Sequence, residues 1–264
     1  MTPFLTWAGG KRWFVQKHAA VLPKKFNRYI EPFLGGGSVF FHLQPSKAIL
    51  GDINPDLVAA YQGIKDDWKA LKRSLQHHQR HHSDEHYYHV RAKTPRGALQ
   101  RASRMIYLNR TCFNGIYRVN LNGEFNVPRG SKNSVILPND SFDSVAKLLE
   151  KADIRLADFE ILIDEAKVGD FVFADPPYTV RHNLNGFVKY NEKLFSWEDQ
   201  ERLAAALIRA RNRGVIIVST NANHPSLHKL YKNNQFSLIT TSRFSSISAS
   251  SNSRKQFEEL IILS

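Results

Sequence analysis

The first 65 residues alternate short apolar runs with glycine or acidic turns, and each turn leads into a helical pattern. The segment FNRYIEPFLGGGSVFFHL predicts a strand, a turn at Gly35–Gly37 and the start of a helix. The segment KAILGDINPDLVAAYQGI predicts the same plan again, with a strand at Ala48–Leu50, an acidic turn at Asp52–Asn54 and a helix from about Pro55. Alternating strands and helices imply a parallel sheet, so we expect an α/β fold.

The same alternation returns in the second half of the chain, after a region of different character. Asp66–Glu150 opens with a polar stretch, Lys65–His89, that is typical of helix. It then carries two turn signals, Asn114-Gly115 and Asn122-Gly123, and the second lies between YRVNL and EFNV, which predicts a β-hairpin. We therefore interpret this region as an inserted subdomain.

Beyond the insertion, we expect strands at Ala152–Leu156, Asp170–Ala174 and Val215–Thr220. We expect a helix at Trp197–Arg213, with Ser196 as its N-cap and Gly214 as its stop. Two final strands, FSLITTSRF and FEELIILS, should flank a serine-rich loop at 245–253.

Composition narrows the class of partner. The chain has 37 Lys and Arg residues against 24 Asp and Glu, a net charge of +13, which favours nucleic acid or an anionic membrane surface. No long basic amphipathic helix and no run of about 18 apolar residues is present, so membrane binding is the weaker hypothesis. The single cysteine, Cys112, excludes an internal disulfide, and a cytoplasmic enzyme is expected.

The glycine turn and the acid after the next strand point to one ligand class. A glycine turn lets a ligand approach the backbone closely, and an acid at the end of the second strand can accept bonds from ribose hydroxyls. Gly35 and Gly37 fit the first two places of a dinucleotide fingerprint, but Phe40 stands in the third. S-adenosylmethionine, which has a ribose and an adenine but no phosphate, fits this pattern. A plain structural turn, and a helix cap for Asp52, remain the alternatives.

The stretch FVFADPPYTV ends a predicted buried strand on a carboxylate, two prolines and an aromatic ring. Prolines cannot donate backbone hydrogen bonds and they stiffen the chain, and Asp175 lies where open α/β sheets bind ligands. Acceptors beside the flat ring of Tyr178 suit the exocyclic amine of a planar base. Such a base must be flipped out of a duplex, and in-line attack on a methyl group then depends on positioning. An ordinary Pro-Pro turn is the alternative.

Taken in order, five segments resemble the Dam-type DNA adenine-N6 methyltransferases, the alpha group of the D12 class. They are FLTWAGGK, EPFLGGGSVFF, DINPDLV, NRTCFNGIYRVNLNGEFNVPRG and DPPY. The resemblance implies a Rossmann-like S-adenosylmethionine-dependent methyltransferase sheet with an inserted helical plus β-hairpin target-recognition subdomain. Residues 1–65 and 151–264 would form the catalytic domain, and 66–150 the target-recognition domain that binds duplex DNA. The implied activity is methyl transfer to adenine N6, within GATC or a related site.

The resemblance also implies roles for individual residues. The catalytic set would be Asp175, Pro176, Pro177 and Tyr178. The cofactor set would be Trp7, Lys11, Gly35, Gly37, Asp52, Asp158, Phe159 and Asp175. The DNA-binding set would be Asn114, Ile116, Arg118, Asn126, Pro128, Arg129 and Lys132, with Arg118 reading a guanine and Ile116 and Pro128 meeting a thymine methyl.

Two positions depart from the family pattern. The family often has a lysine before Trp-Ala-Gly-Gly that helps to read the first base pair, and here the residue is Thr6. An arginine is common just after the hairpin, where this chain has Ser131-Lys132. The site could therefore be relaxed, longer, or read at its outer bases by Arg129 and Lys132.

Other functions stay open at this level. Methylation of RNA or of another planar amine, and a non-catalytic DNA-binding subunit, are the competing hypotheses. Histidines 77, 78, 81, 82, 86 and 89 form a cluster, but no acid and cysteine set joins them, so we expect a solvated or phosphate-facing helix and no metal site. A prokaryotic or phage origin fits the family, whereas a companion restriction enzyme and the oligomeric state stay open.

Overall fold

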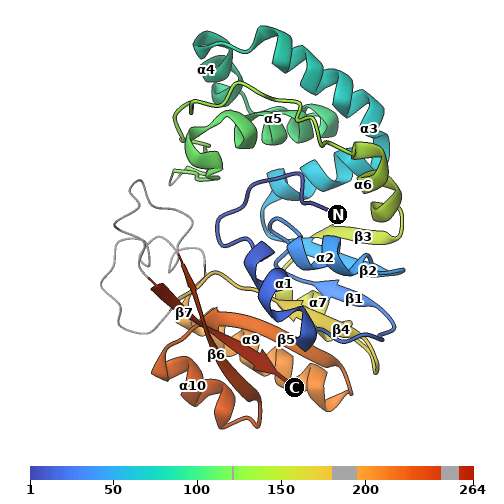
Figure 1. The fold of residues 1–264 in the computed structure, drawn as a ribbon, viewed down its shortest axis with the longest axis vertical. Coiled ribbons are helices and arrows are strands. Elements are labelled where there is room, and N and C mark those ends of the chain that lie inside the picture. Colours follow the sequence, from blue (N-terminus) through green and yellow to red (C-terminus); the bar gives the residue numbers. More distant parts are fainter. Residues whose placement is uncertain (121, 180–194, 245–255) are drawn as a thin grey trace. The chain divides into compact units, whose positions relative to one another are not determined.

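A computed structural model describes residues 1–120, 122–179, 195–244 and 256–264 (Figure 1). The chain divides into two compact units. Unit 1 comprises Met1–Val15 and Leu34–Leu156, and unit 2 comprises Gln16–Phe33 and Ala157–Ser264. The short helices α1 (Arg12–His18) and η1 (Ala19–Val21) lie at the first division between them.

Unit 1 contains the parallel strand pair β2 (Ala48–Asp52) and β3 (Ala152–Leu156), with Ala48 opposite Ala152. The helix α2 (Ser38–Leu43) follows the glycine turn, and α3 (Pro55–His81) follows β2. Asn54 caps α3, because its Oδ1 accepts the backbone N–H groups of Asp56 and Leu57. The predicted strand, acidic turn and helix start at Pro55 are therefore confirmed.

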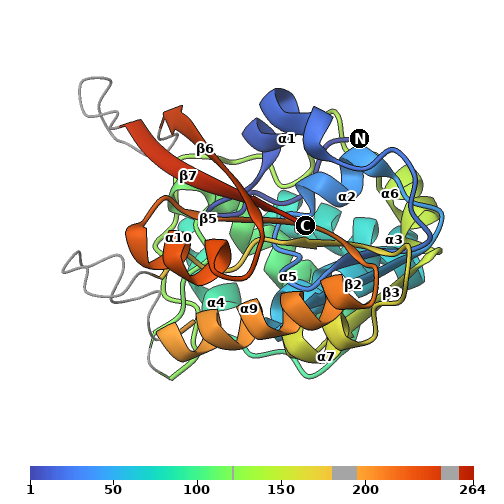
Figure 2. The ribbon, with the colours of Figure 1, turned by 90° about the horizontal axis from the view of Figure 1, so that it is seen from below.

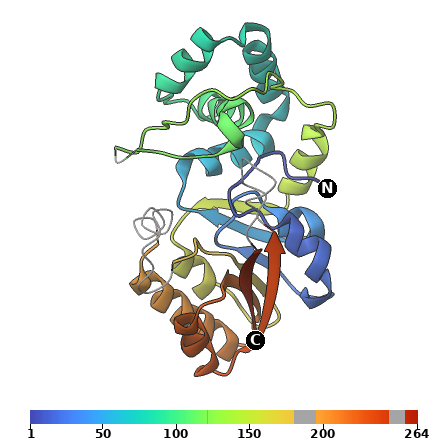
Figure 3. The same ribbon diagram turned by 60° about the vertical axis from the view of Figure 1, so that its left-hand side comes forward.

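The remainder of unit 1 is mostly helical, and Figure 3 shows these helices in cyan to green. The long helix α3 is interrupted at Asp67, whose φ of −153° and ψ of 76° are not helical, close to the predicted start of the insertion. The prediction of helix for Lys65–His89 is confirmed apart from a short break after His81. Three further helices are α4 (Asp84–Ala92), α5 (Ala98–Thr111), which packs along α3, and α6 (Phe142–Leu149).

The segment after α5 is irregular. A one-turn helix, η2 (Phe113–Gly115), is followed by an antiparallel bridge between Val119 and Phe125, and another bridge joins Cys112 to Arg129. The predicted hairpin is thus present as a bridge rather than as two regular strands, and Leu121 in its turn lies outside the described residues. Because isolated two-stranded pairs are marginal in water, a single bridge is a reasonable outcome.

In the part of unit 2 that the structure describes, five strands follow the order β1-β4-β5-β7-β6. The parallel pairs β1/β4 and β4/β5 are followed by antiparallel β5/β7 and β7/β6. All four residues of β4 are buried, as expected of a central parallel strand. The strands are β1 (Tyr29–Glu31), β4 (Phe171–Ala174), β5 (Ile216–Ala222), β6 (Ser237–Phe244) and β7 (Gln256–Leu263).

Besides η1, the described residues of unit 2 include the helices α7 (Phe159–Asp164), α9 (Trp197–Asn212) and α10 (Pro225–Lys232). Helices α7 and α9 lie side by side, as Figure 2 shows along its lower edge. Ser196 and Asp199 form a reciprocal capping box at the start of α9, and Gly214 has a φ of +82° after its end. Both predicted helix boundaries are confirmed, whereas the predicted serine-rich loop at 245–253 lies outside the described residues.

The α/β fold class with parallel strands is therefore confirmed. Within the described ranges, no helix combines the length and the apolar character that crossing a membrane requires.

Candidate functional site

The glycine turn of unit 1 is shaped by left-handed backbone conformations. Gly35 has a φ of +46° and Gly37 a φ of +63°, values that favour glycine. A Cβ atom on Gly35 would lie 2.8 Å from Cδ1 of Trp7, and one on Gly37 would lie 2.8 Å from the Tyr61 hydroxyl. Side chains therefore pack directly against the turn, which no other residue type would allow without displacement.

Asp52 connects the glycine turn to the start of α3. Its Oδ2 accepts the N–H of Gly35 at 3.1 Å, and its Oδ1 accepts the N–H of Asn54 at 3.0 Å. Burial raises the pKa of Asp52 from its usual 3.8 to about 6, although backbone hydrogen bonds from Asn54 and Gly35 lower it. Asn54 rather than Asp52 caps the helix, so the helix-cap alternative for Asp52 does not hold.

The N-terminal segment places its two candidate cofactor residues differently. The ring of Trp7 stacks on Tyr117, with centroids 5.4 Å apart and an interplanar angle of 26°. Lys11 is buried, and its Nζ donates to the carbonyl of Gly9 at 3.0 Å. A buried ammonium needs partners that stabilise its charge, so Lys11 is not the solvated surface lysine that its residue type alone would suggest.

In unit 2, the Asp-Pro-Pro-Tyr segment begins where β4 ends. The register pairs Ala174 with Ser219 of β5, so Asp175 lies next to Thr220. The Thr220 hydroxyl donates to Oδ1 of Asp175 at 2.7 Å. A charge-assisted bond of this length fixes the carboxylate orientation.

Tyr178 is held by an acid from a distant part of the sequence. Its hydroxyl donates to Oε2 of Glu259 at 2.6 Å, and Glu259 is 2% exposed. Burial, with the charges of Asp175 and Glu259, raises the pKa of Tyr178 well above its usual value. Tyr178 therefore stays neutral and anchored at neutral pH.

A buried amide pair supports the backbone of the same segment. Asn221 donates to Oε1 of Gln200 at 2.9 Å, and Gln200 makes weak bonds, both 3.5 Å, to the carbonyls of Pro177 and Thr179. Both amides are fully buried. Because unsatisfied buried amides are costly, this network favours a single conformation of the segment.

Asp158 and Phe159 lie at the start of α7. Oδ1 of Asp158 accepts the N–H of Glu160 at 2.9 Å and so caps the helix. Phe159 is 4% exposed, and its ring stacks on Phe33 with centroids 5.3 Å apart. Phe33 is half-buried, so the aromatic surface at this point is only partly covered.

Residues 109–130 of unit 1, which the resemblance assigns to DNA recognition and which we call the recognition segment, expose several side chains. Asn114 is exposed in a left-handed conformation, with a φ of 55°, and the neighbouring Phe113 is 52% exposed. Arg118 is exposed, and its Nε donates to Oδ1 of Asn126 at 2.9 Å. This bond leaves the terminal guanidinium nitrogens directed away from Asn126 as a two-pronged donor.

The remaining DNA-binding candidates differ in exposure. Pro128 and Lys132 are exposed, and Ile116 is half-buried. Arg129 is half-buried, forms an ion pair with Asp84, and donates to Oδ1 of Asn133 at 2.6 Å. Its guanidinium is thus already engaged within unit 1, which makes Lys132 the better placed of the two for an outer contact.

Comparison with protein families decides the class. Residues 7–247 match the family model of the D12 class N6 adenine-specific DNA methyltransferases. The chain belongs to this family. The resemblance to the D12-class adenine methyltransferases, the α/β fold and the adenine-specific DNA methyltransferase class are thereby confirmed.

Curated relatives agree with the family. The chain is 36% identical to Type II methyltransferase M1.LlaDCHI of Lactococcus lactis subsp. cremoris, over 99% of this chain and 95% of that protein. It is 35% identical to Type II methyltransferase M.MjaIII of Methanocaldococcus jannaschii, over 99% and 98%. It is 30% identical to a DNA adenine methylase of Vibrio cholerae, over 98% and 95%.

Within the family framework, the structure adds residues that sequence patterns did not single out. Thr220 and Glu259 contact the Asp-Pro-Pro-Tyr side chains, and Gln200 contacts its backbone. One signal was available, since Glu259 is an acid inside the apolar run FEELIILS. Phe113 could have been noted as an aromatic beside the Asn114 turn.

The histidine cluster forms a packed group on α3 and α4. Nδ1 of His78 lies 2.9 Å from Nε2 of His86, and the His78 ring stacks on Tyr107 with centroids 4.6 Å apart. Within the described residues, no group of three or more His, Cys, Asp or Glu side chains is arranged to hold a metal ion. Burial, with the charges of His86, His77 and His81, lowers the pKa of His78 from 6.5 to about 4.

This pKa predicts a loss of stability in mild acid. The unfolded chain takes up a proton at His78 below about pH 6.5, whereas the folded chain does so only near pH 4. Stability from His78 is therefore complete above pH 6.5 and is lost as the pH falls through that window. His78→Phe keeps a flat ring against Tyr107, so its melting temperature should fall less between pH 7 and pH 5 than that of the wild type.

Calorimetric melting at several pH values checks this expectation. The exposed His89 provides a control, because His89→Phe removes a neighbouring histidine while leaving the His78 ring in place. Identical pH slopes for the wild type and His78→Phe would contradict the assignment.

Proposed function

We propose that this family member transfers a methyl group from S-adenosylmethionine to N6 of adenine in duplex DNA. The adenine is flipped out of the duplex, and its N6 attacks the methyl carbon in line as the bond from that carbon to sulfur breaks. The observation that supports this proposal most is the way the Asp-Pro-Pro-Tyr segment is held: Thr220 bonds Asp175 at its start, and Glu259 bonds Tyr178 at its end. A rigid acceptor and a rigid aromatic ring are what a positioning mechanism needs.

The chemistry assigned to Asp175 follows from the electronic structure of adenine. The N6 lone pair is conjugated into the ring, which makes the amine a poor nucleophile. A carboxylate that accepts an N6–H bond draws electron density onto nitrogen as it attacks. Pro176 and Pro177 keep the backbone stiff and donate no competing N–H bond, and Tyr178 offers a face for the base.

Each unit carries residues that fit the methyl donor. Asp52 has the acceptor chemistry that ribose hydroxyls require, beside a turn of left-handed glycines. Asp158 can accept from the exocyclic amine of the donor's adenine, next to Phe159. Trp7 and Lys11 complete the proposed set. The donor supplies a methyl group activated by a sulfonium centre, and the protein's task is to align it.

The recognition segment is proposed to read DNA in the major groove. Arg118 suits bidentate bonding to a guanine, and Asn126 holds its guanidinium in place. Pro128 and Ile116 suit contact with a thymine methyl, and Asn114 suits handling of the target. Phe113, exposed beside Asn114, suits the gap that a flipped base leaves.

GATC or a related site is the proposed target. We expect recognition of its outer base pairs to differ from the family pattern, because two residues of this chain depart from that pattern. Thr6 and Ser131 replace a lysine and an arginine that the family often has, and Lys132 is the exposed cation left to contribute. Relatives named Type II methyltransferases favour a companion restriction enzyme as a partner.

Asp175→Ala should reduce methyl transfer on duplex DNA by at least about 100-fold, because the acceptor for the N6–H bond is lost. Tritium transfer to DNA with GATC sites measures this, and mapping of methylated adenines defines the target. Asp153→Ala, which removes an exposed acid on β3, should remain active. Full activity of Asp175→Ala would remove Asp175 from the mechanism, and preferred methylation of structured RNA in competition would favour the RNA alternative.

Affinity for S-adenosylmethionine should increase as Asp52 ionises. With a folded pKa of about 6, the Kd should fall about tenfold between pH 5 and pH 7.5 if only the carboxylate binds the ribose. The stability of the ligand-free protein should depend on pH in the opposite direction. The raised pKa of Asp52 stabilises the fold at low pH, and this contribution is lost as the pH rises through 6. Asp52→Asn should bind weakly with a flatter profile in calorimetry, and a parallel profile would contradict the ribose assignment.

Arg118→Ala should relax specificity at one guanine of the site. A bidentate arginine–guanine contact contributes about 1–3 kcal/mol of discrimination, so the rate ratio between the site and its guanine-substituted variant should fall about tenfold or more. Lys132→Ala is the comparison, because a phosphate contact should weaken binding equally for all sequences. Unchanged discrimination in Arg118→Ala would assign guanine reading to another residue.

A further inference from the structure

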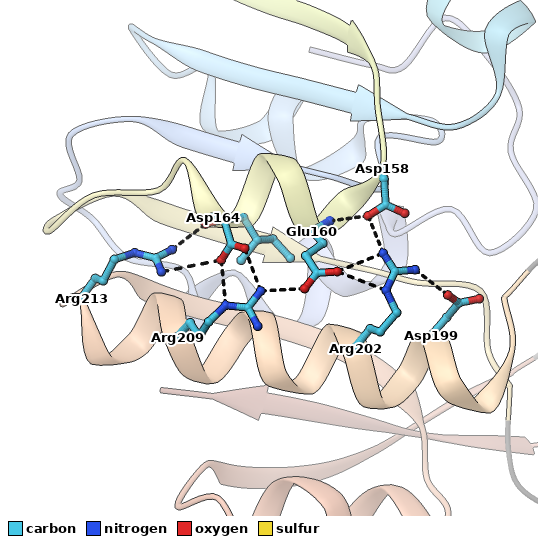
Figure 4. A network of polar contacts seen from close by, with 8 residues as sticks. Asp158, Glu160, Asp164, Asp199, Arg202, Arg209 and Arg213 are labelled. Carbon is cyan, nitrogen blue, oxygen red and sulfur yellow. Dashed lines mark hydrogen bonds and ion pairs between the residues drawn. The ribbon is translucent and has the colours of Figure 1, made fainter.

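An ion-pair network joins α9 and the residue after it to α7, from the N-cap of α7 to its last residue (Figure 4). Two arginines on α9, and Arg213 directly after it, face three acids at or on α7. Glu160 lies between Arg202 and Arg209 and accepts from both. All the pairs are partly exposed, and exposed ion pairs contribute only about 0–1 kcal/mol each to stability. The members are Arg202, Arg209 and Arg213, and Asp158, Glu160 and Asp164, with Asp199 at one end.

Arg202 differs from the other two arginines in what it contacts. Its Nη2 donates to Oδ1 of Asp158 at 2.9 Å, and its guanidinium carbon lies 4.8 Å from the ring centroid of Phe159. One guanidinium therefore contacts both side chains assigned to the adenine end of the methyl donor. Arg209 instead pairs with Asp164, and Arg213 bonds the carbonyls of Ile163 and Ala166 and lies near Asp164.

The bonds to Asp158 determine which oxygen remains for a ligand. Oδ1 takes both the N–H of Glu160 and the Arg202 guanidinium. Among the described residues Oδ2 has no hydrogen-bond partner, and fixing Oδ1 sets the direction in which Oδ2 points. An ionised carboxylate held in this way accepts an N–H strongly and without further ordering.

The contacts of Phe159 add a second constraint. Its ring is stacked on Phe33 and touches Phe195 at a centroid distance of 5.6 Å, while Arg202 contributes a cation–π contact. Asp199 anchors the same guanidinium from within α9 at 2.8 Å. Arg202 is therefore held by Asp199 of its own helix while it contacts the N-cap and the first residue of α7.

We propose that Arg202 is a positioning residue for the methyl-donor site, acting through Asp158 and Phe159. The inference rests on the proposed role of these two residues toward the donor's adenine. Arg202 makes its contribution to cofactor affinity and not to the transfer step.

The test compares Arg202→Met with Arg209→Met, which removes an arginine of similar exposure from the same helix and the same Glu160. Calorimetry with S-adenosylmethionine should give a Kd about tenfold higher for Arg202→Met, the equivalent of one charge-assisted hydrogen bond, and a Kd within about twofold of wild type for Arg209→Met. The two melting temperatures should fall by similar amounts. At saturating S-adenosylmethionine, kcat and the KM for DNA should stay near wild type in both variants.

Two further variants separate the inference from the function on which it rests. Asp158→Asn keeps a helix cap and removes the carboxylate, so it should weaken cofactor binding, and adding Arg202→Met to it should weaken binding little further. If Asp158→Asn leaves the Kd unchanged, the adenine contact of Asp158 is wrong. If Asp158→Asn weakens binding but Arg202→Met does not, or if Arg202→Met and Arg209→Met weaken it equally, the positioning role alone is wrong.

Discussion

The hydrogen bonds of the Asp52 carboxylate are the contacts on which the proposed cofactor residues of unit 1 depend. The carboxylate accepts one N–H from the glycine turn and one from the turn that starts α3, so the two strand–helix transitions are fixed to each other. The Gly35 carbonyl is held in turn by the Tyr61 hydroxyl from α3 at 3.1 Å. The raised pKa of Asp52 reflects the cost of holding a carboxylate there. That cost is acceptable where a ligand with hydroxyl donors completes the coordination.

From the glycine turn, direct packing leads to the recognition segment. Trp7 packs against Gly35 and stacks on Tyr117, and Tyr117 donates to Asp56 at the start of α3. The indole ring of Trp7 is therefore one of the contacts that join the proposed cofactor residues of unit 1 to its proposed DNA-binding residues. In unit 2 the comparable role falls to buried polar groups, since Thr220, Glu259 and the Gln200–Asn221 pair fix a segment that cannot form backbone ladder bonds at its prolines.

Sequence patterns predicted the elements whose signals are local. The helix start at Pro55, the N-cap at Ser196 and the stop at Gly214 depend on bonds between close neighbours in the sequence, and each was found where expected. The cap by Asn54 and the reciprocal bond from Asp199 are additions from the structure. Helix α5 was missed because its residues 102–111 are all buried, including Arg104, Asn109 and Arg110. The helix therefore does not show the alternation of an apolar face and a polar face by which a surface helix is found in a sequence. Those polar groups are satisfied by distant carbonyls, such as Val90 for Arg104 and Phe4 for Arg110. Thr220 and Glu259 were missed for the same reason, because only strand pairing brings them to Asp175 and Tyr178.

The departure at Thr6 can be understood from the way its backbone is held. Asn109 accepts the Thr6 N–H at 3.0 Å, donates to the Thr6 carbonyl at 2.8 Å, and also donates to the Gly115 carbonyl at 3.2 Å. One buried amide thus fixes the position before Trp7 to the turn that carries Asn114. These bonds use the backbone of Thr6, so they do not depend on which side chain stands there. A threonine in place of lysine shortens the reach of the exposed side chain but keeps the scaffold. Outer-base preference can therefore change independently of Arg118, whose orientation depends on Asn126.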